Sequence, residues 1–139
     1  AFAAAGRLAA DWVELDVRVT ADGVLVVHHD PALADGQVIV AKEAAALPEH
    51  VPTLAAALEV CADAALGVNV EIKRLPGEPD HDPEFETAAA VVALLADGML
   101  PVERLLVTSF RAAHGSAHLR AARPGCGGGP GRSRGPRGG

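Results

Sequence analysis

Residues 12–19 limit the possible folds most, because hydrophobic and polar side chains alternate from Val13 to Val19. This period of two predicts a β-strand with one apolar face and one polar face. A second, valine-rich run over residues 24–29 predicts the strand that follows. The apolar face carries Val13, Leu15, Val17 and Val19, and the polar face carries Glu14, Asp16 and Arg18. The chain is therefore expected to build a sheet with unusually many charges on one side.

The rest of the sequence predicts alternating helices and strands. Residues 1–10 resemble the inside of a helix, and residues 31–50 predict loop and short irregular structure. Thr53 is a suitable N-cap for a helix that runs through Ala65 and stops at Gly67.

A third strand follows at residues 68–73, with Asn69, Glu71 and Lys73 on one face. After a loop over 74–82, Asp82 is expected to cap a helix that has Pro83 at its first position and Gly98 past its end. Residues 104–110 predict a fourth strand. Strand, helix, strand, helix, strand is typical of an α/β fold with a parallel sheet.

Composition excludes several classes of protein. The 139 residues fit one domain and carry a formal charge of −6, so neither nucleic acid nor an anionic membrane is an expected partner. The longest apolar run, residues 88–96, is far shorter than the roughly 18 residues that span a bilayer. No signal-peptide layout is visible, which favours a cytoplasmic location. Cys61 and Cys126 do not form a disulfide framework.

The Asp22-Gly23 pair predicts a hairpin between the first two strands, because these residues suit a tight turn. A two-residue loop would put Asp16 opposite His29, and a four-residue loop would put Glu14 there. Either register gathers all three side chains on one face. A three-residue loop would separate them. Alternatively, the two segments are barrel strands that meet only at their ends.

Three carboxylates on strand faces form a candidate metal site: Glu14, Asp16 and Glu71. Half-buried carboxylates are costly unless they are paired or bind a metal. Hard divalent ions such as Mg²⁺ or Ca²⁺ take oxygen ligands of this kind. For any one Glu-x-Asp pair, a simple solvated sheet face is the more common explanation.

His29 and Lys73 are candidates for chemistry beside these carboxylates. An imidazole can take and give a proton during phosphoester cleavage, although a hydrogen-bonded histidine at a strand end is the simpler interpretation. His28 points to the opposite face of its strand. Lys73 could stabilise charge on a phosphate oxygen or form an ordinary ion pair with Glu71.

Taken together, these motifs resemble the glycerophosphodiester phosphodiesterase family. The matching segments occur in the family's order: Glu14-Leu15-Asp16-Val17, Thr20-x-Asp22-Gly23, Val26-Val27-x-His29-Asp30, Pro52-Thr53-Leu54, Val70-Glu71-Ile72-Lys73 and Ser109-Phe110. The resemblance implies a TIM-type (β/α)8 barrel and hydrolysis of a glycerophosphodiester to glycerol 3-phosphate and an alcohol. It also implies that Glu14, Asp16 and Glu71 bind Mg²⁺ or Ca²⁺, that His29 is an acid/base, and that Lys73 lies by the phosphate.

The sequence departs from the family at both ends. The family's His-Arg-Gly strand, which carries a second proton-transfer histidine, is not found, and residues 111–139 become rich in Gly, Pro and Arg. We therefore predict a partial barrel domain over residues 1–110, with about half the strands, and an irregular to disordered tail over residues 111–139. Hydrolysis by the 139 residues alone is expected to be negligible. The alternatives are a related barrel phospholipase D or lysophospholipid phosphodiesterase, and a non-catalytic degenerate fragment.

Overall fold

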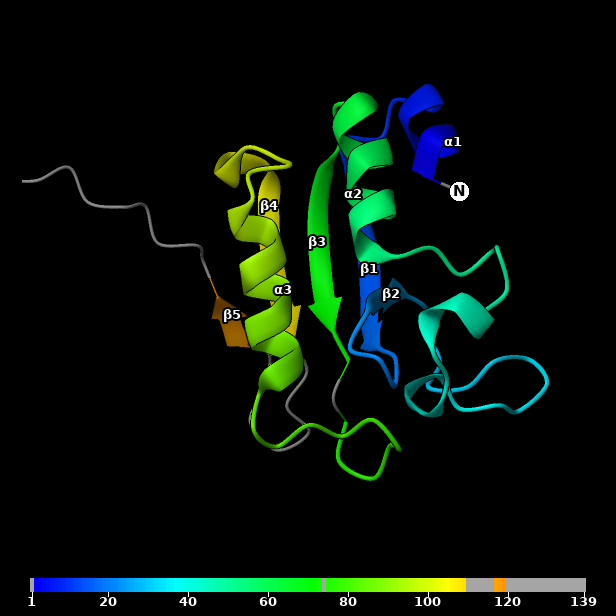
Figure 1. The fold of residues 1–139 in the computed structure, drawn as a ribbon. Coiled ribbons are helices and arrows are strands. Elements are labelled where there is room, and N and C mark those ends of the chain that lie inside the picture. The colour runs from blue at the N-terminus through cyan, green and yellow to red at the C-terminus, as the bar shows by residue number, and fades with distance from the viewer. Residues whose placement is uncertain (1, 74, 110–116, 120–139) are drawn as a thin grey trace, which may run out of the picture.

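A computed structural model describes residues 2–73, 75–109 and 117–119. Its sheet has the strand order β2-β1-β3-β4-β5 (Figure 1). The strands are β1 (Trp12–Val19), β2 (Leu25–Val27), β3 (Gly67–Ile72), β4 (Leu105–Ser109) and β5 (Ala117–Leu119). The α-helices are α1 (Phe2–Arg7), α2 (Leu54–Asp63) and α3 (Glu86–Ala96), and three short 3₁₀ helices are η1 (Ile39–Ala41), η2 (Ala44–Ala46) and η3 (Val102–Arg104).

The centre of the sheet is parallel, as the alternation of strands and helices predicts. β1 pairs with β3, and β3 pairs with β4, both in parallel, with α2 and α3 as the crossovers. β2 and β5 join the two edges in antiparallel pairings. β5 was not expected from the sequence, since its three residues carry no alternation long enough to predict a strand.

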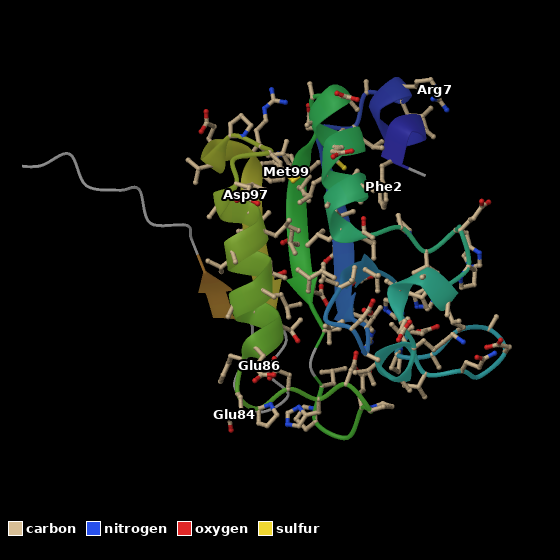
Figure 2. The ribbon with its side chains drawn as sticks, viewed as in Figure 1. Phe2, Arg7, Glu84, Glu86, Asp97 and Met99 are labelled. Atoms are coloured by element: carbon tan, nitrogen blue, oxygen red, sulfur yellow. The ribbon has the colours of Figure 1, made fainter. Side chains whose placement is uncertain are left out.

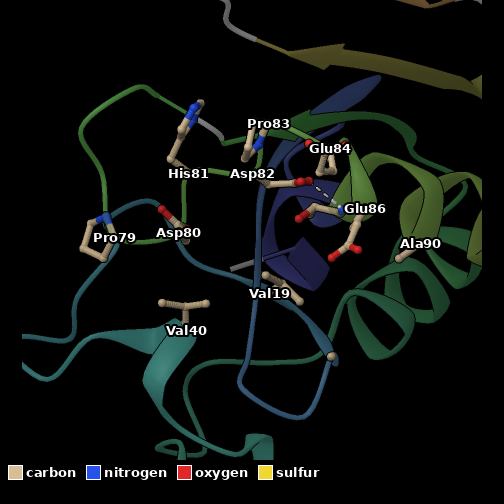
Figure 3. A pocket seen from close by; sticks show the side chains of 12 residues that line it. Val19, Val40, Pro79, Asp80, His81, Asp82, Pro83, Glu84, Glu86 and Ala90 are labelled. Atoms are coloured by element: carbon tan, nitrogen blue, oxygen red, sulfur yellow. Dashed lines mark hydrogen bonds between the residues drawn. The ribbon is translucent and has the colours of Figure 1, made fainter.

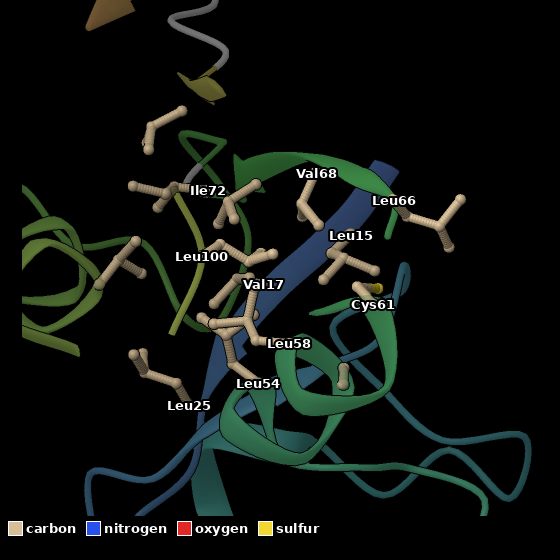
Figure 4. Close-up of a cluster of buried hydrophobic side chains, with 14 residues drawn as sticks. Leu15, Val17, Leu25, Leu54, Leu58, Cys61, Leu66, Val68, Ile72 and Leu100 are labelled. Carbon is tan, nitrogen blue, oxygen red and sulfur yellow. The ribbon is translucent and has the colours of Figure 1, made fainter. Parts of the chain in front are cut away.

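Both crossover helices lie on the same face of the sheet, with α1 beside α2 (Figure 1). The core fills the space between this face and the helices, and strand residues on alternate positions meet leucines of α2 (Figure 4). Its members include Leu15, Val17, Val68, Val70 and Ile72 from the strands and Leu54, Leu58 and Cys61 from α2. Burial raises the pKa of the Cys61 thiol, so this cysteine is an unreactive part of the core.

The start of α2 is as predicted, but its end is not. Thr53 is the N-cap, and its hydroxyl accepts a hydrogen bond from the Ala56 amide. The helix ends earlier, and Ala65 rather than Gly67 takes the left-handed conformation, with φ of 54°. Gly67 instead begins β3 opposite Trp12. A Cβ on Gly67 would lie 2.5 Å from the Trp12 ring, so close packing explains this glycine.

Helix α3 begins three residues later than Pro83, the predicted first position. The N-cap is Phe85 and not Asp82, because residues 83–84 form a turn that does not join the helix. The Asp82 carboxylate still accepts a hydrogen bond from the Thr87 amide in the first turn, at 2.8 Å. Gly98 lies past the end of the helix with φ of 77°, as predicted. Figure 2 shows Glu84 and Glu86 at the beginning of this helix, and Asp97 and Met99 at its opposite end.

The hairpin between β1 and β2 has a three-residue loop, the register that separates His29 from Glu14 and Asp16. Thr20 exchanges hydrogen bonds with Val24, which leaves the three-residue loop Ala21–Gly23, and Gly23 takes a φ of 78°. The ladder pairs Val17 with Val27, and the His28 amide donates to the Asp16 carbonyl. The prediction of a two- or four-residue loop is therefore wrong.

The predicted tail over residues 111–139 lies outside the described residues, apart from the backbone of β5. Phe110, Cys126 and the arginines of the tail are among the residues that lie outside. No helix in the described part of the chain is both long and apolar enough to cross a membrane.

Candidate active site

The polar face of β1 and β3 brings the three predicted carboxylates together. In the parallel ladder Asp16 is the partner of Glu71, and Glu14 is the partner of Asn69. Paired residues of neighbouring strands project from the same face of a sheet, so Glu14, Asp16 and Glu71 lie on one side, away from the helices. The predicted sharing of a face by Asn69, Glu71 and Lys73 holds as well.

Lys73 lies between two of these carboxylates. Its Nζ donates to Glu71 Oε1 at 2.5 Å and contacts Asp16 Oδ1 at 3.0 Å. Partial burial opposes the charge of the ammonium, but the hydrogen bonds to Glu71 and Asp16 outweigh it and raise the Lys73 pKa. The lysine is therefore fully charged at neutral pH and links β1 to the end of β3.

Glu14 completes the group through Glu71. A hydrogen bond between the two carboxyl groups raises the pKa of Glu14, and burial and the negative charges of Glu71 and Asp16 act in the same direction. The Asn69 side chain also approaches Glu14 Oε1, at 3.4 Å, and accepts a bond from the Thr108 hydroxyl at 3.1 Å.

The chemistry of this donor set fits a hard divalent cation. The three carboxylates lie on neighbouring strands, Lys73 contacts two of them, and the nearness of Glu71 raises the pKa of Glu14, so this face carries more negative than positive charge. No group of three His, Cys, Asp or Glu side chains in the described ranges is already spaced as a metal site. Lys73 holds Asp16 and Glu71 in their present positions, so metal binding requires that its ion pairs give way.

His29 lies two residues beyond the end of β2 and is not joined to the carboxylates by a described contact. Its ring is about three-quarters exposed, and Nδ1 lies 2.8 Å from Asp30 Oδ1. This hydrogen bond lowers the pKa of Asp30. The register of the hairpin puts His28, not His29, opposite Asp16. The role of His29 in catalysis remains a prediction.

Arg18 is the charged residue of this face that the sequence analysis did not single out. Its side chain is 2% exposed and forms ion pairs with Asp80 at 2.7 Å and Glu78 at 2.8 Å. The sequence held two indications of this contact. Arg18 lies on the same face of its strand as Glu14 and Asp16, and the loop after β3 is acidic. The contact was missed because nothing in a single sequence pairs a strand with a loop sixty residues away.

A cavity of about 420 Å³ lies at the junction of β1, the loop after β3 and the start of α3 (Figure 3). Figure 3 shows its lining, which includes Val19, Val40, Asp80, Asp82 and Glu86. None of the predicted site residues lines this cavity. The lining includes Glu86, Thr87 and Ala90 of α3, so the cavity lies beside this helix and not over Glu14, Asp16 and Glu71.

Comparison with known proteins agrees with the motifs. Residues 1–39 match the glycerophosphoryl diester phosphodiesterase family. Among curated proteins, none matches the sequence. A phosphodiesterase from Oleispira antarctica, solved with the product sn-glycerol-3-phosphate, is 30% identical to this chain, with a TM-score of 0.66. The match covers 80% of this chain and 50% of the Oleispira chain.

Two further solved structures have the same fold. The glycerophosphodiester phosphodiesterase of Thermotoga maritima is 30% identical with a TM-score of 0.62, over 79% of this chain and 46% of its own. The enzyme from Parabacteroides distasonis is 26% identical with a TM-score of 0.65, over 78% of this chain and 47% of its own.

These findings confirm the resemblance to the glycerophosphodiester phosphodiesterase family that the motifs indicate. They also confirm the fold class, since the described α/β sheet corresponds to part of a TIM-type barrel. The chain spans about half the length of the solved structures that it matches.

Proposed function

We propose that this chain carries the metal- and phosphate-binding face of a glycerophosphodiester phosphodiesterase. The observation that supports this proposal is the convergence of Glu14, Asp16, Glu71 and Lys73 on the polar face of two neighbouring parallel strands. Four charged side chains held together by strand backbone suit a reaction in which charge develops on phosphate. The solved homologue that contains sn-glycerol-3-phosphate makes a glycerophosphodiester the best-supported substrate class.

The five candidate site residues have three proposed roles. Glu14, Asp16 and Glu71 would hold a divalent cation, Mg²⁺ or Ca²⁺, which supplies a Lewis acid that polarises the phosphoryl group. The Lys73 ammonium neutralises charge on a phosphate oxygen, and its raised pKa keeps it charged for that purpose. His29 is proposed to transfer a proton to or from the reacting oxygen.

The first test is binding of the product by the purified 139-residue chain. Glycerol 3-phosphate should shift the NMR signals of Lys73 and its strand neighbours in the presence of Mg²⁺ or Ca²⁺, and less so without a cation. Lys73→Met should weaken binding roughly tenfold, since it removes a charged hydrogen-bond donor to phosphate. Lys42→Met is the matched control, because Lys42 lies at the end of η1 and its ammonium donates to Gln37, which precedes η1. Equal losses in both variants, or no binding, would contradict the proposal.

The second test is turnover. The chain alone is expected to release glycerol 3-phosphate from glycerophosphocholine or glycerophosphoethanolamine at a negligible rate. Clear cation-dependent release that disappears in His29→Ala would overturn this expectation and support the role of His29. A preference for a lysophospholipid would instead indicate a related barrel phospholipase. The cation and substrate are varied separately, so metal dependence and substrate class are decided independently.

A further inference from the structure

A single buried guanidinium, that of Arg18, joins three segments of the chain. Its Nε and Nη2 both donate to the His29 carbonyl, at 3.0 and 2.7 Å. Its Nη1 donates to both Asp80 carboxylate oxygens, at 2.9 and 2.7 Å, and to Glu78 at 2.8 Å. The donors thus connect β1 with the end of the hairpin and with the loop that follows β3.

This arrangement requires arginine. Two nitrogens of the planar fork converge on one carbonyl oxygen, while the third faces the carboxylates on the other side. Lysine has the charge but only a compact ammonium, which cannot reach both sites in one geometry. Burial opposes the charge of Arg18, and the bonds to Glu78 and Asp80 more than offset it, so the Arg18 pKa is raised. The side chain is a fixed, permanently charged link.

The bond to the carbonyl matters because His29 has few other constraints. β2 ends at Val27, and the last ladder bond runs from the His28 amide to the Asp16 carbonyl at 2.9 Å. The His29 ring is largely exposed, so core packing does not set its direction. Arg18 fixes the peptide group at the point where the ladder has ended.

The same guanidinium acts on the segment that follows Lys73. Asp80 has a side chain only 3% exposed, and it lies seven residues after the lysine. A buried carboxylate needs a paired cation, so this loop must dock on Arg18. The arginine therefore fixes the histidine and the loop after the lysine to the strand that carries Glu14 and Asp16.

We propose that Arg18 is a positioning residue, which sets the place of the His29 peptide relative to the carboxylate face through its bonds to the His29 carbonyl. The proposal rests on the proposed function only for the use of His29 as a proton carrier. The placement itself is a structural claim about the chain without substrate or cation.

The experiment compares Arg18→Lys and Arg18→Met with the control Glu78→Gln. Glu78→Gln removes one ion pair of Arg18 and leaves both bonds to the carbonyl. Amide hydrogen exchange and histidine ring NMR signals are measured in each variant. We expect the His28 amide to exchange roughly tenfold faster in Arg18→Lys, with the His29 ring signals shifted, while the amides of Leu15 and Val70 in the sheet centre stay protected. In Glu78→Gln both reporters should match the wild type.

A merely structural role would give a different pattern. If Arg18→Lys accelerates exchange equally across the sheet, or leaves His28 and His29 unchanged, the positioning role is wrong. If Arg18→Met does not fold, Arg18→Lys decides the question, because it keeps a cation beside Asp80.

A paramagnetic probe separates this proposal from the proposed function. Mn²⁺ at the carboxylates should broaden the His29 ring signals in the wild type and do so less in Arg18→Lys. Equal broadening in both proteins would contradict the positioning role. If Mn²⁺ broadens no residue of β1 or β3, the proposed metal site is wrong, and the exchange data still decide the role of Arg18.

Discussion

The two faces of β1 and β3 use the same backbone in opposite ways. On the helix side Leu15, Val17, Val70 and Ile72 are 0–1% exposed and pack into one hydrophobic cluster. On the other side the alternate positions carry carboxylates and Lys73. The apolar face is stabilised mainly by burial, which does not depend on the charge state of any side chain. The polar face is stabilised only while its charges are balanced.

Residues that stabilise the fold and residues with a proposed function therefore alternate along the same two strands. Side chains on the helix side make the sheet rigid, and that rigidity holds Asp16 beside Glu71 at the spacing of neighbouring strands. The polar face then carries an excess of negative charge. Repulsion would move these side chains apart if the strands did not hold them. Lys73 balances part of this charge, and a bound cation would balance more of it.

The largest effect is expected from a cavity on the helix side. Leu58 is fully buried in α2, and Leu58→Ala should lower the free energy of unfolding by about 3 kcal/mol, from lost burial and the void that remains. Urea denaturation measures the change. Leu8→Ala is the control, since Leu8 is 83% exposed and its loss should cost less than about 0.5 kcal/mol. Similar losses in both variants would show that the helix side is not the core.

A smaller effect is expected from Lys73→Met on the polar face. The change leaves Asp16 and Glu71 without this ammonium, and we expect a loss of about 1–3 kcal/mol in the absence of divalent cations. Millimolar Mg²⁺ or Ca²⁺ should restore much of that loss, because the cation replaces the missing charge. Thermal denaturation with and without the ion measures both. A loss that no cation reverses would indicate that Lys73 acts through packing only.

The smallest effect is a pH dependence at Glu14. Its folded-state pKa is raised, so its protonated form contributes stability that is complete below the unfolded-state pKa and is lost as the pH rises through the folded-state pKa. Glu14→Gln should therefore be at least as stable as the wild type at pH 7 and lose this advantage near pH 4. Unfolding free energies at several pH values test the sign. An advantage for wild type that grows with pH would contradict it.

Much of the fold could be predicted from local patterns. The alternation within residues 12–19 reflects the two faces of a strand, whereas the N-cap Thr53 and the stop at Gly98 depend on a few neighbouring residues; the structure confirms all three. Gly67 was misread because its reason is a contact with Trp12, more than fifty residues away. The hairpin register was wrong because Thr20 bonds to Val24 and closes a three-residue loop, a choice that Asp22-Gly23 alone does not determine.

The candidate site shows the same division. Strand parity predicted that Glu71 and Lys73 share a face, and the parallel ladder places Glu71 beside Asp16. The sequence could not predict that Arg18 is buried against Asp80, since that contact depends on how the loop after β3 folds back. It also could not fix the orientation of His29, which lies beyond the last residue of β2.

The most direct test of the central claim is a calorimetric titration of the chain with Mg²⁺, Ca²⁺ and Mn²⁺. If Glu14, Asp16 and Glu71 share one cation, the wild type should bind one ion per chain, and Glu71→Gln should weaken binding at least tenfold. Glu59→Gln, on the exposed side of α2, should bind as the wild type does. An affinity that is unchanged in Glu71→Gln, or lost equally in Glu59→Gln, would contradict the account.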